Sequence, residues 1–291
     1  MMREVSNRIV ARRDWLRWSL GAILGGVSGG LASCQSAQRS GRTYQVGSKN
    51  KDWHSEEFRK MVTLGESTTA GGWSTSPERC WVPVLAALIN DFQTQPIEYV
   101  NSGIGANVIS RRSPSYEHSG KPAALERLDK HVIVHKPDLL VVSYGLNDAR
   151  GATPLDLFRE EMERLLSEVR REIQPLIVLL SPYYMSDFDR YGPHWNHATL
   201  EIFAEFGRAT AEIATANECL YADVLSAAAG ADWVVHHDTV HQNDVGHRLV
   251  AHRIFEVLAQ NCSGIAKKTR AAEKISPRWR DESVLKADYG Y

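Results

Sequence analysis

The chain has 291 residues, of which 43% are hydrophobic and 24% are charged. This composition is typical of a globular protein with a buried core, and it excludes a fibre and an intrinsically disordered chain. The formal net charge is −1 at pH 7, so no overall positive field would attract a polyanion, and we expect no nucleic-acid partner.

The first 34 residues have the pattern of an export signal. Arg12 and Arg13 precede an uncharged, glycine-rich run at 18–33, which is shorter than the ~20 residues needed to span a bilayer. The arginine pair resembles a twin-arginine export signal, and the sequence LASC ending at Cys34 resembles a bacterial lipobox. These resemblances imply a bacterial protein with lipid on Cys34, located in the periplasm or on the outer face of the cytoplasmic membrane. An ordinary secretory signal or a weak amphipathic tail is the alternative.

The rest of the chain divides into three segments. Residues 35–57 are polar and are predicted to tether the membrane anchor to a folded domain. Apolar runs then alternate with helical patterns over 58–262, and the final segment, 263–291, becomes charged and loses this periodicity. We expect 263–291 to be a surface extension, with a lid over the substrate as the alternative.

Five short apolar runs within the domain are predicted to be buried strands, because they contain β-branched residues and lie between segments with helical spacing. They are Met61–Gly65, Ile97–Asn101, Asp138–Gly145, Pro175–Pro182 and Cys219–Val224. Strands that alternate with helices of this length form parallel sheets covered on both faces. The expected fold is therefore one α/β domain, a three-layer α/β/α sandwich around a five-stranded, mainly parallel sheet.

Three cysteines follow the signal segment: Cys80, Cys219 and Cys262. An exported protein could oxidise one pair of them. Because each lies among apolar residues, we expect three reduced and buried cysteines.

Ser67 follows the first predicted strand in the sequence LGES, where the chain turns toward the next helix. The loops after parallel strands line the ligand crevice of such a sheet, so this position would present the serine hydroxyl to a substrate. A serine hydroxyl needs a base within hydrogen-bond reach to act as a nucleophile. Considered alone, a serine in this position is more often a helix cap than a nucleophile.

The sequence HHDTVHQNDVGH contains a candidate base, His241, and a candidate orienting acid, Asp238. A carboxylate on the far ring nitrogen fixes the imidazole tautomer and stabilises the protonated ring. His237 and His241 could instead bind a metal, but such a pair needs a helix to stack it, and this segment lies between a strand and a helix. We therefore expect no metal site and no cofactor. Structural or rim roles are expected for the remaining histidines of the segment, His236, His237 and His247.

Four segments in this order resemble blocks I, II, III and V of the SGNH hydrolases, also called GDSL lipases and esterases: LGES, VNSGIG, SYGLND and HHDTVH. The resemblance covers roughly 58–262. It implies a catalytic triad of Ser67, His241 and Asp238. Glu66 stands where the family usually has Asp, which is a change that keeps the charge.

The same resemblance implies an oxyanion hole with three donors. They are the backbone N–H groups of Ser67 and Gly103 and the side-chain amide of Asn147. A residue without Cβ, such as Gly103, lets the backbone approach a substrate closely. Asp148 is expected to be structural support.

The expected activity is that of an exported serine ester hydrolase that forms an acyl-enzyme. The sequence contains no long apolar lid helix, which favours short acyl esters, including acetyl groups on carbohydrate. The aromatic segment Ser181–His197 is expected to overhang the site. Four of its residues are candidates for binding a sugar ring or acyl chain, or for packing the loop: Tyr183, Tyr184, His194 and Trp195. The alternative function is an inactive, lipid-anchored protein that binds a glycan or an ester.

Overall fold

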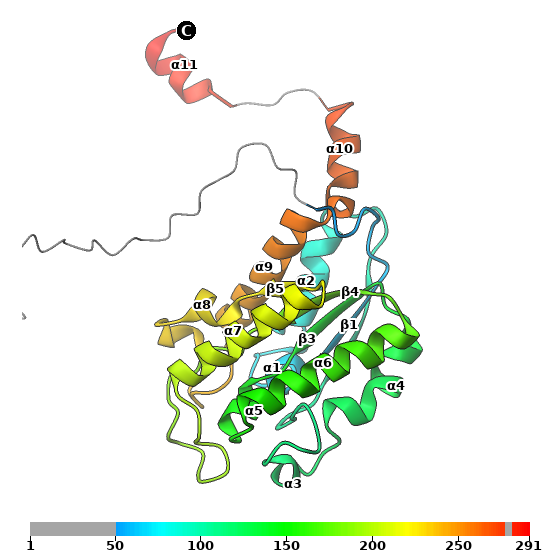
Figure 1. Ribbon diagram of the computed structural model, residues 1–291. Coiled ribbons are helices and arrows are strands. Elements are labelled where there is room, and N and C mark those ends of the chain that lie inside the picture. Colours follow the sequence, from blue (N-terminus) through cyan, green and yellow to red (C-terminus); the bar gives the residue numbers. More distant parts are fainter. Residues whose placement is uncertain (1–50, 277–280) are drawn as a thin grey trace, which may run out of the picture. The chain divides into compact units, whose positions relative to one another are not determined.

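A computed structural model describes residues 51–276 and 281–291 (Figure 1). The predicted export signal, with Arg12, Arg13 and Cys34, lies outside these residues, as does most of the predicted tether. Within the described part of the chain, no helix has the length and apolar character needed to cross a membrane.

All five predicted strands are present, and they form one sheet (Figure 1). The strands are β1 (Lys60–Gly65), β2 (Glu98–Gly103), β3 (Leu139–Ser143), β4 (Leu176–Leu180) and β5 (Leu220–Ala222). Their order in the sheet is β2-β1-β3-β4-β5, and every pair is parallel. The register places Gly65 opposite both Gly103 and Ser143. The carboxyl ends of β1, β2 and β3 therefore meet at one edge of the sheet.

Helices cover both faces of this sheet. The described α-helices are α1 (Ser67–Ala70), α2 (Trp81–Asn90), α3 (Tyr116–Ser119), α4 (Leu128–His131), α5 (Leu146–Arg150), α6 (Leu155–Glu172), α7 (Leu200–Ala216), α8 (Val224–Ala228), α9 (Asp244–Asn261), α10 (Lys267–Glu273) and α11 (Ser283–Tyr289). Helices α2 and α9 pack against each other on one face, and α6 packs against α7 on the other (Figure 1). The predicted three-layer α/β/α fold is confirmed.

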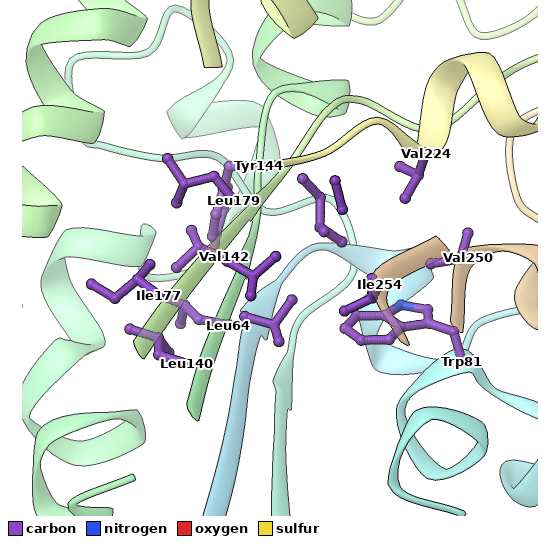
Figure 2. Packing of buried hydrophobic residues seen from close by; sticks show 14 of the residues in the cluster. Leu64, Trp81, Leu140, Val142, Tyr144, Ile177, Leu179, Val224, Val250 and Ile254 are labelled. Atoms are coloured by element: carbon purple, nitrogen blue, oxygen red, sulfur yellow. The ribbon is translucent and has the colours of Figure 1, made fainter. Parts of the chain in front are cut away.

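The central strands β3 and β4 are apolar except for Ser143 at the end of β3. Strands β3 and β4 have the sequences LLVVS and LIVLL, because a parallel strand that is covered on both faces has no exposed side. Figure 2 shows Leu140 and Val142 of β3 beside Ile177 and Leu179 of β4 in the core. The sheet that carries the loops of the site is therefore held from both sides.

The folded domain extends beyond the predicted limits of 58–262. Trp53 donates its backbone N–H to the carbonyl of Asn261 at 2.8 Å. Gly264 lies so close to the backbone of Glu56 that a Cβ on it would be 1.8 Å from the Glu56 carbonyl oxygen. The last residues of the predicted tether and the first residues of the predicted extension therefore belong to the domain.

The three cysteines of the domain are buried and free, which confirms the expectation from the sequence. Burial raises the pKa of the Cys80 and Cys219 thiols to about 11 and that of Cys262 to about 12. These thiols stay protonated at neutral pH and are poor nucleophiles.

Removing side-chain volume from the centre of the sheet should destabilise the domain. Leu140 is fully buried, so Leu140→Ala is expected to lower the free energy of unfolding by about 2–5 kcal/mol. The measurement is urea denaturation followed by circular dichroism. Val134 is 63% exposed and provides the matched control, because Val134→Ala removes apolar atoms that are already in water. Equal losses for the two variants would contradict the packing described here.

Candidate active site

Ser67 lies at the point where strand β1 ends and the short helix α1 begins. The turn needs a residue without a side chain at Gly65, because a Cβ there would lie 2.2 Å from Thr69 Oγ1 and 2.9 Å from the Ser143 carbonyl oxygen. As the first residue of α1, Ser67 has a backbone N–H without a carbonyl partner in the helix. The serine therefore presents both its hydroxyl and this N–H at the sheet edge.

The loop before α9 brings His241 to the serine. His241 Nε2 is 2.7 Å from Ser67 Oγ, and His241 Nδ1 is 2.5 Å from Asp238 Oδ2. The other carboxylate oxygen, Oδ1, accepts the backbone N–H groups of Val240 and His241, each at 3.1 Å. Thr239 bends this loop through a left-handed conformation with φ of 75°. The three residues predicted to form the triad are thus in one continuous hydrogen-bonded chain.

Both titratable members of this chain have shifted pKa values. Burial lowers the pKa of His241 below its ordinary value of 6.5 and outweighs the hydrogen bond that its ring donates to Asp238, which acts to raise this pKa. Burial acts to raise the pKa of Asp238, but the hydrogen bonds from the His241 ring and backbone outweigh it and lower this pKa. The histidine is therefore neutral, and the aspartate ionised, at neutral pH, as a base and its orienting acid require.

Asn147 lies beside Ser67 in the same cavity. Its Nδ2 donates to the Asn107 carbonyl at 3.2 Å, and its Oδ1 accepts a hydrogen bond from Arg150 Nη1 at 3.1 Å. Because the amide nitrogen carries two hydrogens, one of them remains for a ligand. The contact to Arg150 fixes which end of the amide is the donor.

The structure corrects the assignment of Gly103 as an oxyanion donor. Its N–H donates to Asn101 Oδ1 at 3.0 Å, and its α-carbon lies against helix α1, where a Cβ would be 2.1 Å from the Ala70 nitrogen. Gly105 and Ala106, two and three residues further along, do line the cavity. Ala106 has a φ of 54°, and a left-handed alanine is not recognisable from the sequence VNSGIGAN.

Two buried carboxyl groups support the loops around Asn147. Glu66 Oε1 accepts the backbone N–H groups of Gly145 and Asn147 at 3.3 and 3.1 Å, and burial raises the Glu66 pKa well above its ordinary value. Asp148 Oδ1 accepts the Ser113 hydroxyl at 3.0 Å, and burial raises the Asp148 pKa to about 6. Both groups are fully covered, which agrees with the structural role predicted for Asp148.

A cavity of about 430 Å³ opens onto Ser67, Asn147 and His241. Four of the residues that line it were not predicted from the sequence: Trp73, Lys121, Arg150 and Tyr191. The Trp73 ring stacks on His236 with centroids 5.2 Å apart, and His236 itself does not line the cavity. His247 is fully buried under α2, where its Nδ1 accepts the N–H of Trp81 at 3.3 Å.

Two of the four candidate substrate residues are structural. Tyr183 is buried, and its hydroxyl accepts from Ser143 Oγ at 2.7 Å. Tyr184 is also buried, and its hydroxyl donates to Asp232 Oδ1 at 2.7 Å. His194 is exposed and stacks on His118 with centroids 3.5 Å apart, and it does not line the cavity. Only Trp195 does so.

Tyr191, and not Tyr183 or Tyr184, is the tyrosine of this segment that faces the cavity. It lines the cavity, and its hydroxyl donates to the Asp238 carbonyl. The aromatic segment after β4 does contribute rings to the cavity wall, but its sequence does not show which of its rings face the cavity.

In the described part of the chain, no group of three or more His, Cys, Asp or Glu side chains could hold a metal ion.

Comparison with known proteins places the chain in a family. The model of the GDSL-like lipase/acylhydrolase family matches residues 63–249, which is more than half of the chain. The protein belongs to this family and is an ester-hydrolysing enzyme. No curated protein matches the sequence.

Solved structures share the fold. A lipase/acylhydrolase from Enterococcus faecalis is 25% identical with a TM-score of 0.55, and the match covers 69% of this chain and 95% of that one. An acetylxylan esterase from Geobacillus stearothermophilus is 21% identical with a TM-score of 0.52, over 71% and 96% of the two chains. A putative lipolytic protein of the G-D-S-L family from Desulfitobacterium hafniense is 20% identical with a TM-score of 0.52, over 68% and 99%.

The lowered pKa of His241 predicts where the acid limb of activity lies. If neutral His241 accepts the serine proton, kcat/KM should persist at pH 6.5 and fall only as pH drops through the lowered pKa. The measurement is kcat/KM against pH on an uncharged activated acetate ester, over the range in which circular dichroism shows a folded protein.

Asp148 provides the control, because its pKa is also near this range. An unchanged acid limb in Asp148→Asn would leave His241 as its source. A limb centred above pH 6.5 would contradict the role of burial at His241.

Proposed function

We propose that the protein is a serine ester hydrolase in which Ser67 is the nucleophile, His241 the general base and Asp238 the orienting acid. The observation that carries this proposal is the hydrogen-bonded chain from Ser67 Oγ through the His241 ring to Asp238, with contacts of 2.7 and 2.5 Å. A nucleophile, a base and an orienting group within this reach are what acyl transfer through serine requires.

In the proposed reaction, Ser67 Oγ attacks the ester carbonyl while His241 Nε2 takes the hydroxyl proton. The Ser67 N–H, the Asn147 amide and the backbone N–H groups of the Gly105–Ala106 loop donate to the oxygen that becomes negative. Collapse of the tetrahedral intermediate breaks the ester C–O bond, and His241 returns its proton to the departing alcohol. Water activated by His241 then hydrolyses the acyl-enzyme and frees the carboxylic acid.

The substrate is proposed to be a short acyl ester, including acetyl groups on carbohydrate. The cavity volume of about 430 Å³ is at the small end of the range for ligand sites. Its aromatic walls, Trp73, Tyr191 and Trp195, are suited to packing on a sugar ring. The acetylxylan esterase is an example of a protein with this fold that is named for acetyl esters of a carbohydrate.

The alternative of an inactive binding protein has less support. Family membership indicates an ester-hydrolysing enzyme, and each side chain that the reaction needs is present and in hydrogen-bond contact. An inert protein that still bound acylated glycans would favour the alternative.

Replacing the nucleophile tests the reaction. Ser67→Ala should lower kcat on an activated acetate ester by about 10⁴-fold or more, because nucleophile and base act as a unit. Stopped-flow and steady-state turnover measure the loss, and circular dichroism checks the fold. Ser226 is an exposed serine on α8, and Ser226→Ala should turn over at the wild-type rate. Residual activity of Ser67→Ala near that rate would remove Ser67 from the mechanism.

We also propose that the enzyme is exported and held by lipid on Cys34. Support comes from the sequence order of Arg12 and Arg13, the uncharged run at 18–33, and LASC. A domain whose cysteines are all free needs no disulfide to complete it, which suits export in a folded state.

Fractionation of a bacterium that expresses the full chain tests this location. Ester hydrolysis is expected in the membrane fraction for the wild type, outside it for Cys34→Ala, and in the cytoplasm for Arg12→Lys/Arg13→Lys. A wild-type chain that is soluble and keeps its first methionine would contradict the proposal.

A further inference from the structure

Arg150 is a buried cation in the wall of the cavity. It is only 7% exposed, and it lines the cavity together with Asn147, Tyr191 and Trp195. Its guanidinium carbon lies 4.9 Å from the ring centroid of Tyr191 and 5.8 Å from that of Trp195. Its hydrogen bond to Asn147 Oδ1 occupies one of five N–H donors.

No carboxylate among the described residues lies within ion-pair distance of this guanidinium. Glu66 is an electrostatic partner, but its Oε1 accepts the backbone N–H groups of Gly145 and Asn147 and forms no ion pair with Arg150. Asp238 is a weaker electrostatic partner of Arg150, and its carboxylate accepts the hydrogen bond from the His241 ring. Arg150 Nε is buried without a hydrogen-bond partner. Burying a cation without a paired anion is costly, so the site is incomplete without a ligand of opposite charge.

A second cation lines the cavity beside the nucleophile. Lys121 Nζ donates to the carbonyl of Gly105 at 2.6 Å, and Gly105 lies next to Ser67. Among the described residues, those that line the cavity include these two cations and no Asp or Glu. The cavity therefore attracts anions, although the whole chain carries a net charge of only −1.

We propose that the natural substrate carries a carboxylate on the alcohol side of its ester, as in an O-acyl ester of an acidic sugar, and that Arg150 and Lys121 bind this carboxylate. The inference rests on the proposed function and specifies its substrate class. Aromatic rings in the same wall, Trp73, Tyr191 and Trp195, would pack on the sugar ring. Arginine is the residue best suited to hold a carboxylate in such a wall, because its planar fork binds both oxygens.

A matched pair of substrates tests the inference on the full chain. The acetyl ester of a methyl glucuronoside and that of a methyl glucoside, acetylated at the same hydroxyl, differ only in the carboxylate. We expect kcat/KM to be about tenfold or more higher for the glucuronoside, the factor that a charge-assisted hydrogen bond supplies. Added salt should reduce this ratio, because screening weakens the attraction.

Variants assign the preference to the two cations. Arg150→Gln should bring the ratio of kcat/KM values close to one, Lys121→Gln should lower it, and Arg150→Lys should keep part of it. Because Arg150 also contacts Asn147, its variants are expected to slow both substrates, so the readout is the ratio and not the rate. Arg164 lies on the exposed side of α6, and Arg164→Gln should leave the ratio unchanged.

Three outcomes would overturn the inference. One is equal turnover of the two sugars by the wild type. Another is a loss in Arg150→Gln that is the same for both sugars, which would mean that Arg150 only positions Asn147. The third is a preference for a carboxylate on the acyl side of the ester only. In that case an aryl hemisuccinate would be hydrolysed faster than an aryl butyrate, and the glucuronoside would not be preferred to the glucoside. Absence of turnover with every ester, neutral activated acetates included, would instead remove the proposed function.

Discussion

The close packing of helix α1 on the ends of strands β1 and β2 is the constraint on which the rest of the site depends. A Cβ would collide with the helix at Gly103, where it would lie 2.1 Å from the Ala70 nitrogen, and at Gly65, where it would lie 2.2 Å from Thr69 Oγ1. Only residues without a side chain allow this approach. Because Ser67 is the first residue of α1, these two contacts determine where its hydroxyl lies above the sheet.

Buried polar groups hold the loops around this packing. The Arg127 guanidinium donates to the carbonyls of Ser102 and Gly65 at 2.6 and 3.1 Å, and so joins the ends of β2 and β1. Glu66 and Asp148 accept backbone and hydroxyl donors instead of pairing with the cations nearby. The acids therefore support the loops, and among the described residues neither forms an ion pair with Arg150 or Lys121, the two cations that line the cavity.

The fold and the candidate triad could be predicted from the sequence because their signals are local. Apolar runs such as LLVVS, alternating with helical periods, indicate a parallel sheet wherever they occur in a chain. Asp238 and His241 lie in one short loop, and that spacing already allows the carboxylate to reach the ring. Ser67 could be proposed only because four segments in order resemble the blocks of the SGNH hydrolases, since its 2.7 Å contact with His241 spans 174 residues of sequence.

The sequence by itself determined the α/β/α architecture, the edge of the sheet that carries the site, and which serine, histidine and aspartate meet there. Only the tertiary structure decided which neighbours complete the cavity. It turned Tyr191 toward the cavity and Tyr183 into the core, lined the cavity with Ala106 in place of Gly103, and left Arg150 buried without a paired anion. The physical reason is that a residue's orientation depends on the volume left by distant segments, and a linear pattern carries no record of that volume.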